Sequence, residues 1–183
     1  MTKEEALRLL NEKIKTPNLI KHSLAVGAIM RALANYLQED EDKWEIAGLL
    51  HDIDYEETKN NPKEHSLIGA KFLEKIGLDK DIVYAIKAHN PVHNLPRKSK
   101  LDKALFAADP LSGLIVAAAL VLPSKKLKDL TVDNILHRFK EKGFARGANR
   151  ENISTCKEIG LSLTEFFKIA LESMKKVDKE LDL

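Results

Sequence analysis

The sequence contains very little cysteine: Cys156 is the one cysteine among 183 residues, so no disulfide can form within the chain. A chain without disulfides suits a reducing compartment, and we expect a cytoplasmic protein. Aromatic residues are also scarce, at 5% of the chain, and the net charge is only +2. These values indicate neither a base-stacking surface nor a basic one, so we expect no nucleic-acid polymer as a partner.

Long apolar runs are missing as well. The most apolar stretch, "GLIVAAALVL" at residues 113–122, is about half as long as the run of roughly 18 residues that indicates a membrane helix. The N-terminus, "MTKEEALRLL", is charged and contains no signal-peptide core. We therefore expect no membrane partner, and residues 113–122 form either buried core or the interface of a homodimer.

The alternation of apolar and polar residues that marks β-strands is absent, whereas helical periodicity runs through nearly the whole chain. The predicted fold class is therefore all-α, a multi-helix bundle. Capping boxes at Thr2–Glu5 and Ser162–Glu165 open the first and last helices, and Asn61 with Pro62 is expected to open another. We expect a bend at Pro110, a helix entered at "FARGANRENI" (144–153), and helices at 2–15, 18–37, 42–52, 61–77, 79–89, 99–109, 111–121, 131–142 and 163–181.

Five polar side chains fall on the apolar faces of these helices, near helix ends: His22, His51, His65, His89 and Asp109. A single histidine in such a place is usually an ordinary hydrogen-bonded core residue. Several buried polar groups, however, cost about a few kcal/mol each unless they are satisfied. One shared cation would satisfy them together, and imidazole with carboxylate is a ligand set for zinc, iron, manganese, nickel or cobalt.

The doublet His51–Asp52 in "AGLLHDIDYE" (47–56) constrains the local structure. Adjacent residues on a straight helix point about 100° apart, so both side chains can bind one metal only if the helix ends or distorts there. The turn-like stretch "DYEETKNNP" that follows indicates an ending. We therefore expect the helix to stop at the metal, with its last residues as ligands.

With these residues assembled, the chain resembles the HD-domain superfamily of metal-dependent phosphohydrolases over roughly residues 18–125. The signature of that family is a helical histidine, a later His-Asp doublet and a distant aspartate, which fall here on His22, His51–Asp52 and Asp109, the last in "FAAD". The resemblance implies a helical HD core at about 18–125 and a C-terminal helical extension at about 126–183, within a single domain 1–183.

Two further histidines match a dinuclear branch of that superfamily: His65 in "KEHSLIGA" and His89 in "IKAHN". The resemblance then implies one divalent transition metal on His22, His51, Asp52 and Asp109. A second would lie on Asp52, His65 and His89, with Asp52 bridging. One or two ions per chain remain open, and so does the identity of the metal. We expect His93 to be a loop histidine and His137 to be structural or exposed.

The function implied by the resemblance is hydrolysis of a phosphate ester or anhydride in a nucleotide-like or other small phosphorylated metabolite by a metal-activated water. The expected catalytic residues are Asp52, Asp54, Lys63 and Arg97, and the expected phosphate-binding residues are Lys87, Arg146 and Arg150. Asp54 either orients a ligand histidine or is a solvated turn residue. Asp54 and Tyr55 stand where members that cleave cyclic dinucleotides have Gly-Lys, which argues against that activity. A non-catalytic metal-binding module and a di-iron oxygenase are the alternatives.

Overall fold

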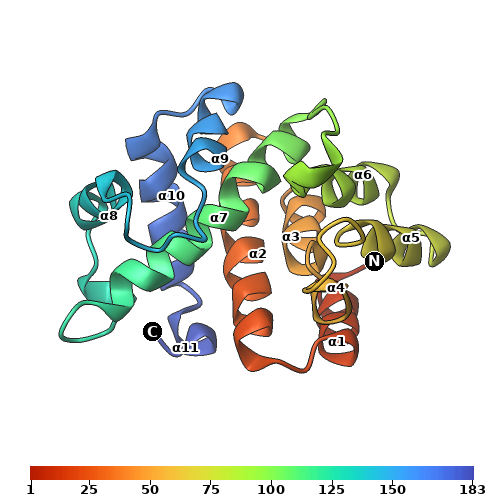
Figure 1. The fold of residues 1–183 in the computed structure, drawn as a ribbon, viewed down its shortest axis with the longest axis horizontal. Helices are drawn as coiled ribbons and strands as arrows, with labels where there is room; N and C mark the ends of the chain where they lie inside the picture. The colour runs from red at the N-terminus through yellow and green to blue at the C-terminus, as the bar shows by residue number, and fades with distance from the viewer.

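The computed structural model describes residues 1–183 and contains helices but no strand (Figure 1), which confirms the predicted all-α fold. The first part of the chain forms α1 (Lys3–Lys13), α2 (Pro17–Leu37), α3 (Glu41–Leu50), α4 (Tyr55–Thr58), α5 (Leu67–Lys75), α6 (Lys80–His89) and α7 (Lys100–Leu120). The rest forms α8 (Val132–Lys140), α9 (Arg150–Ser154), α10 (Leu163–Lys175) and α11 (Asp178–Leu181). Single turns of 3-10 helix occur at η1 (Pro91–His93), η2 (Leu127–Asp129) and η3 (Thr155–Ile159).

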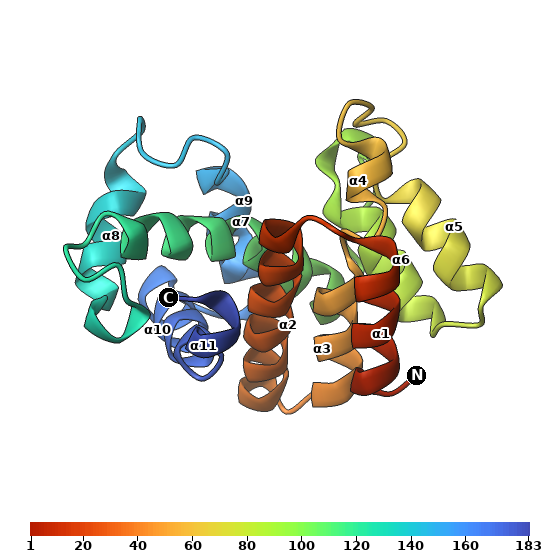
Figure 2. The same ribbon diagram turned by 90° about the horizontal axis from the view of Figure 1, so that it is seen from below.

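The long helix α7 runs through the middle of the molecule. It contacts α2, α3 and α6 of the first part and α8, α9 and α10 of the second. Figure 2 shows α3 and α6 toward one end of the molecule and α8 and α9 toward the other, and α2 and α10 pack directly against each other between these ends. A single cluster of 47 buried apolar residues extends across both groups, from Leu33 of α2 through Leu105 of α7 to Phe166 of α10. By length and composition alone α7 could cross a membrane, but 61% of its most apolar window is buried in this bundle.

The close approach of α2 and α3 places the first half of the site. A Cβ atom added to Gly48 of α3 would lie 2.7 Å from the Cα atom of Gly27 of α2, so the two helices touch backbone to backbone. Glycine permits this contact because it has no side chain. The contact brings the N-terminal part of α2, which carries His22, beside the C-terminal end of α3, which carries His51.

Local capping explains where several helices begin. The predicted boxes at Thr2–Glu5 and Ser162–Glu165 are both formed, and Ser99 with Asp102 makes a third at the start of α7. In each, the two side chains satisfy otherwise unpaired backbone N–H groups of the first turn.

Three predicted elements differ in the structure. The helix expected at 61–77 is wrong in its first part, because residues 62–66 form turns and α5 begins only at Leu67, after Ser66 with a φ of 71°. The bend expected at Pro110 does not divide the helix: α7 continues through it, and buried Leu105 and Leu111 on either side offset the one lost hydrogen bond. The last predicted helix, 163–181, is two helices, α10 and α11.

Candidate metal centre

Six polar side chains from distant parts of the sequence meet at one place beside α7. His22 comes from α2, His51 and Asp52 from the end of α3, His65 from the turn before α5, His89 from the last turn of α6, and Asp109 from the middle of α7. The α3 helix ends at Leu50 with His51 as its C-cap, and residues 51–54 form a turn. Because the helix ends there, His51 and Asp52 both face the cluster.

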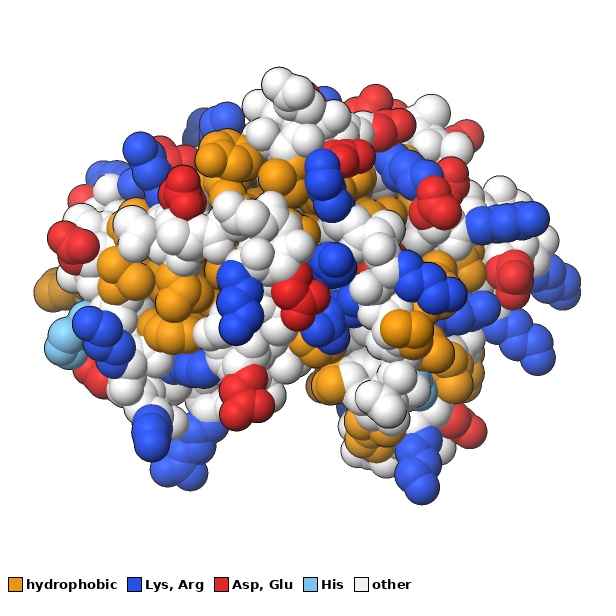
Figure 3. Space-filling view, turned by 90° about the horizontal axis from the view of Figure 1, so that it is seen from above, with side chains coloured by type: hydrophobic (Ala, Val, Ile, Leu, Met, Phe, Trp, Pro, Cys, Tyr) orange, Lys and Arg blue, Asp and Glu red, His pale blue; other side chains and the backbone are white.

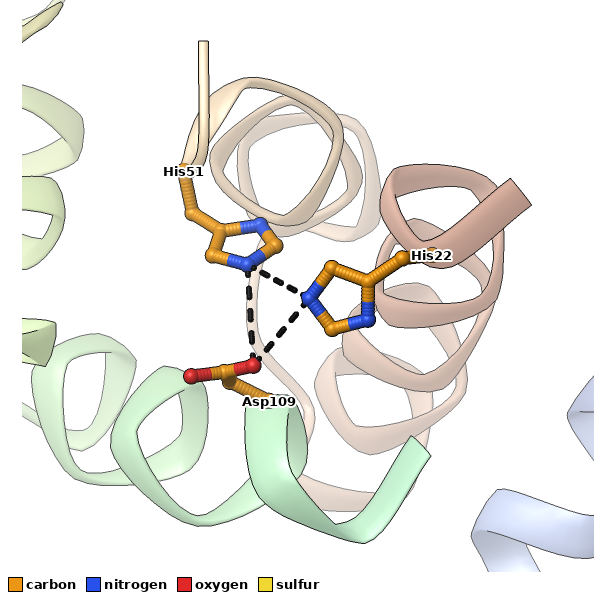
Figure 4. Close-up of side chains that lie close together, drawn as sticks. All are labelled: His22, His51 and Asp109. Atoms are coloured by element: carbon orange, nitrogen blue, oxygen red, sulfur yellow. Dashed lines mark hydrogen bonds and ion pairs between the residues drawn. The ribbon is translucent and has the colours of Figure 1, made fainter. Parts of the chain in front are cut away.

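The first donor group consists of His22, His51 and Asp109 (Figure 4). The Nε2 atom of His22 lies 3.1 Å from the Nε2 atom of His51 and 3.1 Å from Oδ1 of Asp109. His51 Nε2 lies 3.7 Å from that same oxygen. Ligand bonds of about 2.1 Å place neighbouring donors roughly 3.0 to 3.4 Å apart for right-angled to tetrahedral geometry. The two separations of 3.1 Å fall within this range and the third, 3.7 Å, is slightly longer, so the three donors lie close enough together to share one ion.

The second donor group lies on the other side of Asp52. Its Oδ1 atom is 3.4 Å from His89 Nε2, 3.3 Å from His65 Nε2 and 3.5 Å from His51 Nε2. The donor atoms of His51, Asp52 and His89 lie close enough together to share an ion. Oδ2 of Asp52 lies 3.6 Å from His22 Nε2 in the first group. Asp52 thus presents one carboxylate oxygen to each group, as a ligand that bridges two ions would.

All four imidazoles of the cluster are oriented in the same way. The Nδ1 atom of His51 lies 2.8 Å from the carbonyl oxygen of Gly48, and that of His89 lies 2.7 Å from the carbonyl of Ile86. These contacts require N–H at Nδ1. In the neutral ring the lone pair is then on Nε2, which faces the cluster. Ser112 performs this function for His22: its hydroxyl donates to the Asp109 carbonyl and so accepts from His22 Nδ1, 3.1 Å away.

The fourth imidazole, His65, is oriented by Asp54. Oδ1 of Asp54 accepts from His65 Nδ1 at 3.0 Å, and Oδ2 accepts from the backbone N–H of Gly69 at 2.7 Å. The Asp54 side chain is only 2% exposed, so it is not a solvated turn residue. Of the two roles expected for Asp54, the geometry favours orientation of a ligand histidine.

The histidines and carboxylates of the cluster shift one another's pKa values. Burial lowers the pKa of His51, but the carboxylates of Asp52 and Asp109 outweigh it and raise that pKa to about 9. Burial likewise opposes protonation of His65, while Asp52 and Asp54 raise its pKa to about 10. Burial acts to raise the pKa of Asp52, but the surrounding imidazoles hold it well below its usual value. The carboxylates therefore stay charged and favour positive charge at the cluster, whether a proton or a metal ion.

The cluster is open to solvent on the side of the first donor group. His51 is fully buried, whereas the side chains of His22 and Asp109 are 24% and 30% exposed. A cavity of about 300 Å³ begins at His22 and Asp109 and is walled on its far side by residues 145–148. A second cavity, of about 350 Å³, also includes His22 and runs between α7 and the α11 segment. Figure 3 shows a notch at the lower edge of the molecule in that view.

The predicted cationic residues differ in their positions. Arg146 lines the 300 Å³ cavity together with His22 and Asp109. Lys63 is exposed, in the turn that precedes His65.

Three other predicted cations have partners outside the donor cluster. Arg97 forms an ion pair with Glu158 at 3.0 Å and lies over the ring of Phe106. Lys87 pairs with Glu74 at 3.8 Å on α5. Arg150 donates hydrogen bonds to five backbone carbonyls, those of Arg138, Phe139, Phe144, Ala145 and Ala148. Glu158 lies 61 residues from Arg97. The carbonyls bound by Arg150 are nearer in sequence, but only the local fold turns them toward its guanidinium.

Two of the remaining polar residues support the site without facing it. The Nε2 atom of His93 lies 2.8 Å from the carbonyl oxygen of His65, in η1 rather than in an irregular loop. Asn90 donates from Nδ2 to the carbonyls of Pro62 and His65 and so holds the turn that carries His65. Neither Asn90 nor Ser112 was expected from the sequence, although Asn90 directly follows a predicted ligand. His137 is exposed and pairs with Glu141, as expected.

Comparison with known proteins agrees with this geometry. Residues 19–114, about half of the chain, match the HD domain. The chain belongs to the HD domain family. The prediction of that family from His22, His51–Asp52 and Asp109 is therefore confirmed. No solved structure matches the chain.

Several curated relatives of this HD domain protein are named Ribonuclease Y. That of Oleidesulfovibrio alaskensis is 37% identical over 133 residues, which cover 69% of this chain and 25% of the relative. That of Nitratidesulfovibrio vulgaris strain DP4 is 38% identical over 139 residues, covering 73% and 26%. That of Alkaliphilus metalliredigens is 28% identical over 186 residues, covering 97% and 38%. The chain thus spans about a quarter to two fifths of the length of these relatives.

Proposed function

We propose that this HD domain is a metal-dependent phosphohydrolase that cleaves phosphodiester bonds in RNA or in short oligoribonucleotides. The observation that carries the proposal is the cluster of six donor side chains around Asp52. In this cluster each imidazole has its Nδ1 atom tied to another group and its Nε2 atom directed inward. A histidine that served only the core would need no such common orientation.

The residues of the first donor group, with Asp52, would hold one divalent ion. Asp52, His65 and His89 would hold another, with Asp52 bridging. Such ions, when bound, supply a water of lowered pKa and neutralise the charge of the phosphate. Both oxygens of Asp52 face imidazoles, so Asp52 acts in this scheme as a ligand rather than as the proton acceptor.

Asp109 is the better proton acceptor among the carboxylates of the cluster. Only its Oδ1 atom faces His22 and His51, and its other oxygen points away from both rings (Figure 4). The two imidazoles outweigh the opposing effect of burial and keep the pKa of Asp109 below its usual value, so the carboxylate is charged at neutral pH. Its partial exposure lets it reach a water or substrate oxygen in the cleft.

The RNA part of the proposal revises our expectation that no nucleic-acid polymer would be a partner. It is supported by the relatives named Ribonuclease Y, which align over more than two thirds of this chain. It is also supported by the open cleft, since the exposed side of the cluster faces two cavities that meet at His22. A polymer could lie in such a cleft, because neither cavity encloses the reacting position.

A nucleotide or other small phosphorylated metabolite remains the second candidate substrate. The cavity between Asp109 and residues 145–148, at about 300 Å³, is near the lower end of the range for small-molecule sites. Arg146 in its wall would bind a terminal phosphate. The alternatives of a non-catalytic module and of a di-iron oxygenase are less well supported, because the donor set is complete and the relatives are named as ribonucleases.

The test is a hydrolysis assay with two substrate classes. Protein prepared without chelator would be incubated with Mn²⁺, Zn²⁺ or Fe²⁺ and with end-labelled single-stranded RNA, and in parallel with a panel of nucleotides. We expect metal-dependent shortening of the RNA and a loss of at least 100-fold in rate for Asp109→Ala. Glu57→Ala, an exposed carboxylate on α4, is the matched control and should cleave at the wild-type rate.

Three outcomes are distinct. Cleavage of RNA that depends on both metal and Asp109 supports the proposal. Cleavage of nucleotides but not of RNA would show that the substrate is a small phosphorylated metabolite, the second candidate. Binding of metal without turnover of either class would leave this domain as a metal-binding module and overturn the proposed activity.

A further inference from the structure

The two cavities beside the metal cluster share more than His22. Gly113 of α7 also lines both of them, and it is exposed. A Cβ atom added at Gly113 would have no neighbouring heavy atom within 4 Å, so the space above this residue is open. The helix itself does not require glycine there, because the φ of Gly113 lies in the ordinary region. Gly113 therefore lies where the two cavities adjoin, and no side chain fills the space above α7 at this position.

The two ends of this passage differ in chemistry. Toward α9, the wall consists of Arg146 and its neighbours Ala145, Gly147 and Ala148. Toward α11, the apolar part of the wall consists of Val116, Leu120, Leu181 and Leu183, and the polar residues Asn18, Lys21 and Asp182 also line the cavity. Lys21 is paired with Asp182 at 2.6 Å, whereas Arg146 forms no ion pair or side-chain hydrogen bond. The uncompensated positive charge is therefore at the α9 end only.

The wall that carries Arg146 is held in place. Arg150 donates hydrogen bonds to the carbonyls of Phe144, Ala145 and Ala148 within this wall, and to two carbonyls at the end of α8. Ala145 has a φ of 44°, in the left-handed region that non-glycine residues rarely adopt without support. Arg150 supplies that support, so Arg146 projects from a fixed segment rather than from a free loop.

We propose that the substrate lies along a groove that crosses α7 at Gly113, with one nucleotide unit on each side of the phosphate at the metal cluster. The apolar α11 end receives a nucleobase, whose faces are apolar and whose edge can bond to Asn18. The α9 end receives the next phosphate of the chain, which binds Arg146 as a charge-assisted pair. This inference rests on the proposed phosphodiesterase function and specifies that a substrate of at least two nucleotides is needed for full binding.

The experiment compares a short oligoribonucleotide with a smaller chromogenic phosphodiester, methyl p-nitrophenyl phosphate, which carries neither a nucleobase nor a second phosphate. Gly113→Leu places a side chain in the open passage. We expect it to lower kcat/KM for the oligoribonucleotide at least ten times more than it lowers kcat/KM for the small diester. Gly143→Leu, at an exposed glycine that also has open space above it but lines neither cavity, is the matched control and should act on both substrates as the wild type does.

The charge at the α9 end is tested separately. Arg146→Ala should raise KM for the oligoribonucleotide about tenfold and leave kcat nearly unchanged. In a plot of the logarithm of the binding constant against the logarithm of the salt concentration, the slope should become smaller by about 1, because one phosphate contact is lost. Lys142→Ala, an exposed cation on the same segment that lines neither cavity, should alter none of these values.

Binding is measured in parallel, so that failure of the groove and failure of the proposed function can be told apart. Fluorescence anisotropy of a labelled oligoribonucleotide should show weaker binding to Gly113→Leu, whether or not the wild type cleaves it. Binding that depends on Gly113 without cleavage would support the groove and overturn the function. Cleavage of RNA with equal kcat/KM in wild type and Gly113→Leu, or an equal loss for both substrates, would overturn the groove.

Discussion

At the scale of single residues, Asp52 is the centre of the site. Its two oxygens face different donor groups, and four imidazoles have their Nε2 atoms within 3.6 Å of one or the other. The remaining polar residues act through the imidazoles: Asp54 orients His65 and Ser112 orients His22. Removing such a partner frees the ring to rotate or to change its tautomer, so the effect on metal binding should be large although no ligand is lost.

Asp54→Ala tests this directly. Without Oδ1 of Asp54, His65 loses the acceptor for its Nδ1–H group, and we expect the affinity for the second metal to fall by about 10- to 100-fold. Isothermal titration calorimetry with the metal measures this affinity. The first metal is expected to bind as in the wild type. Glu57→Ala is the control. Equal weakening of both metals would indicate general unfolding and contradict the specific role.

The pKa values of the imidazoles predict how metal binding depends on pH. In the metal-free chain the pKa values of His51 and His65 are raised to about 9 and about 10, so both rings are protonated at neutral pH. A metal must displace those protons, and its apparent affinity should therefore rise as pH increases from 6 toward 9. Calorimetry in buffers of different ionisation enthalpy should record about two protons released at pH 7. Metal binding without proton release would contradict the assigned ligands.

At the scale of elements, the site depends on where helices end and on how closely two of them pack. The α3 helix ends at Leu50, which lets His51 and Asp52 face the same point. The backbone contact between Gly27 and Gly48 then holds α3 against α2 and sets the separation of His22 and His51.

Gly48→Ala should disturb this contact. The added methyl group would lie within 3 Å of three backbone atoms of α2, so the helices must separate, and we expect a loss of about 1–3 kcal/mol in the free energy of unfolding. Urea denaturation with chelator present measures the loss without contribution from metal. Gly113→Ala is the control: its added methyl group has open space, and it should stabilise the helix by about 0.5–1 kcal/mol. Unchanged stability in Gly48→Ala would show that the helices can shift freely.

At the scale of the whole molecule, the donor residues join segments that are far apart in sequence, α2, α3, α6 and α7 with the turn before α5. A metal bound to them favours the folded chain, in which these donors are together, over the unfolded chain, in which they are dispersed.

Metal should therefore raise the melting temperature. At a free concentration 100-fold above Kd, one ion adds about 2.7 kcal/mol, which corresponds to a rise of about 5–10 °C for a domain of this size. Differential scanning calorimetry with and without chelator tests it. His22→Ala should show a smaller rise, because it removes a donor of the first group, whereas His137→Ala, an exposed histidine, should behave as the wild type. A wild-type melting temperature unaffected by chelator and by added metal would argue against the centre.

Much of this organisation could be predicted from the sequence because its causes are local. Helical periodicity and the capping boxes at Thr2 and Ser162 depend on residues within one turn of each other, and the structure contains both boxes. The inward placement of His22, His89 and Asp109 follows from helical spacing in the same way. The helix expected at 61–77 failed because Asn90, far away in sequence, bonds to the carbonyls of Pro62 and His65 and holds that segment as turns.

The sequence by itself determined the all-helical class, most helix boundaries and the donor residues, since these rest on spacing and side-chain chemistry. Only the tertiary structure decided which cations face the cleft. Arg97 and Arg150 have the charge that a phosphate site needs, but Glu158 and five backbone carbonyls bind them elsewhere, and Arg146 alone of the predicted arginines lines a cavity with His22. A long, flexible cationic side chain takes whichever partners the fold brings within reach. Glu158 lies 61 residues from Arg97, and the backbone of residues 138–148 is folded so that five of its carbonyls point at Arg150.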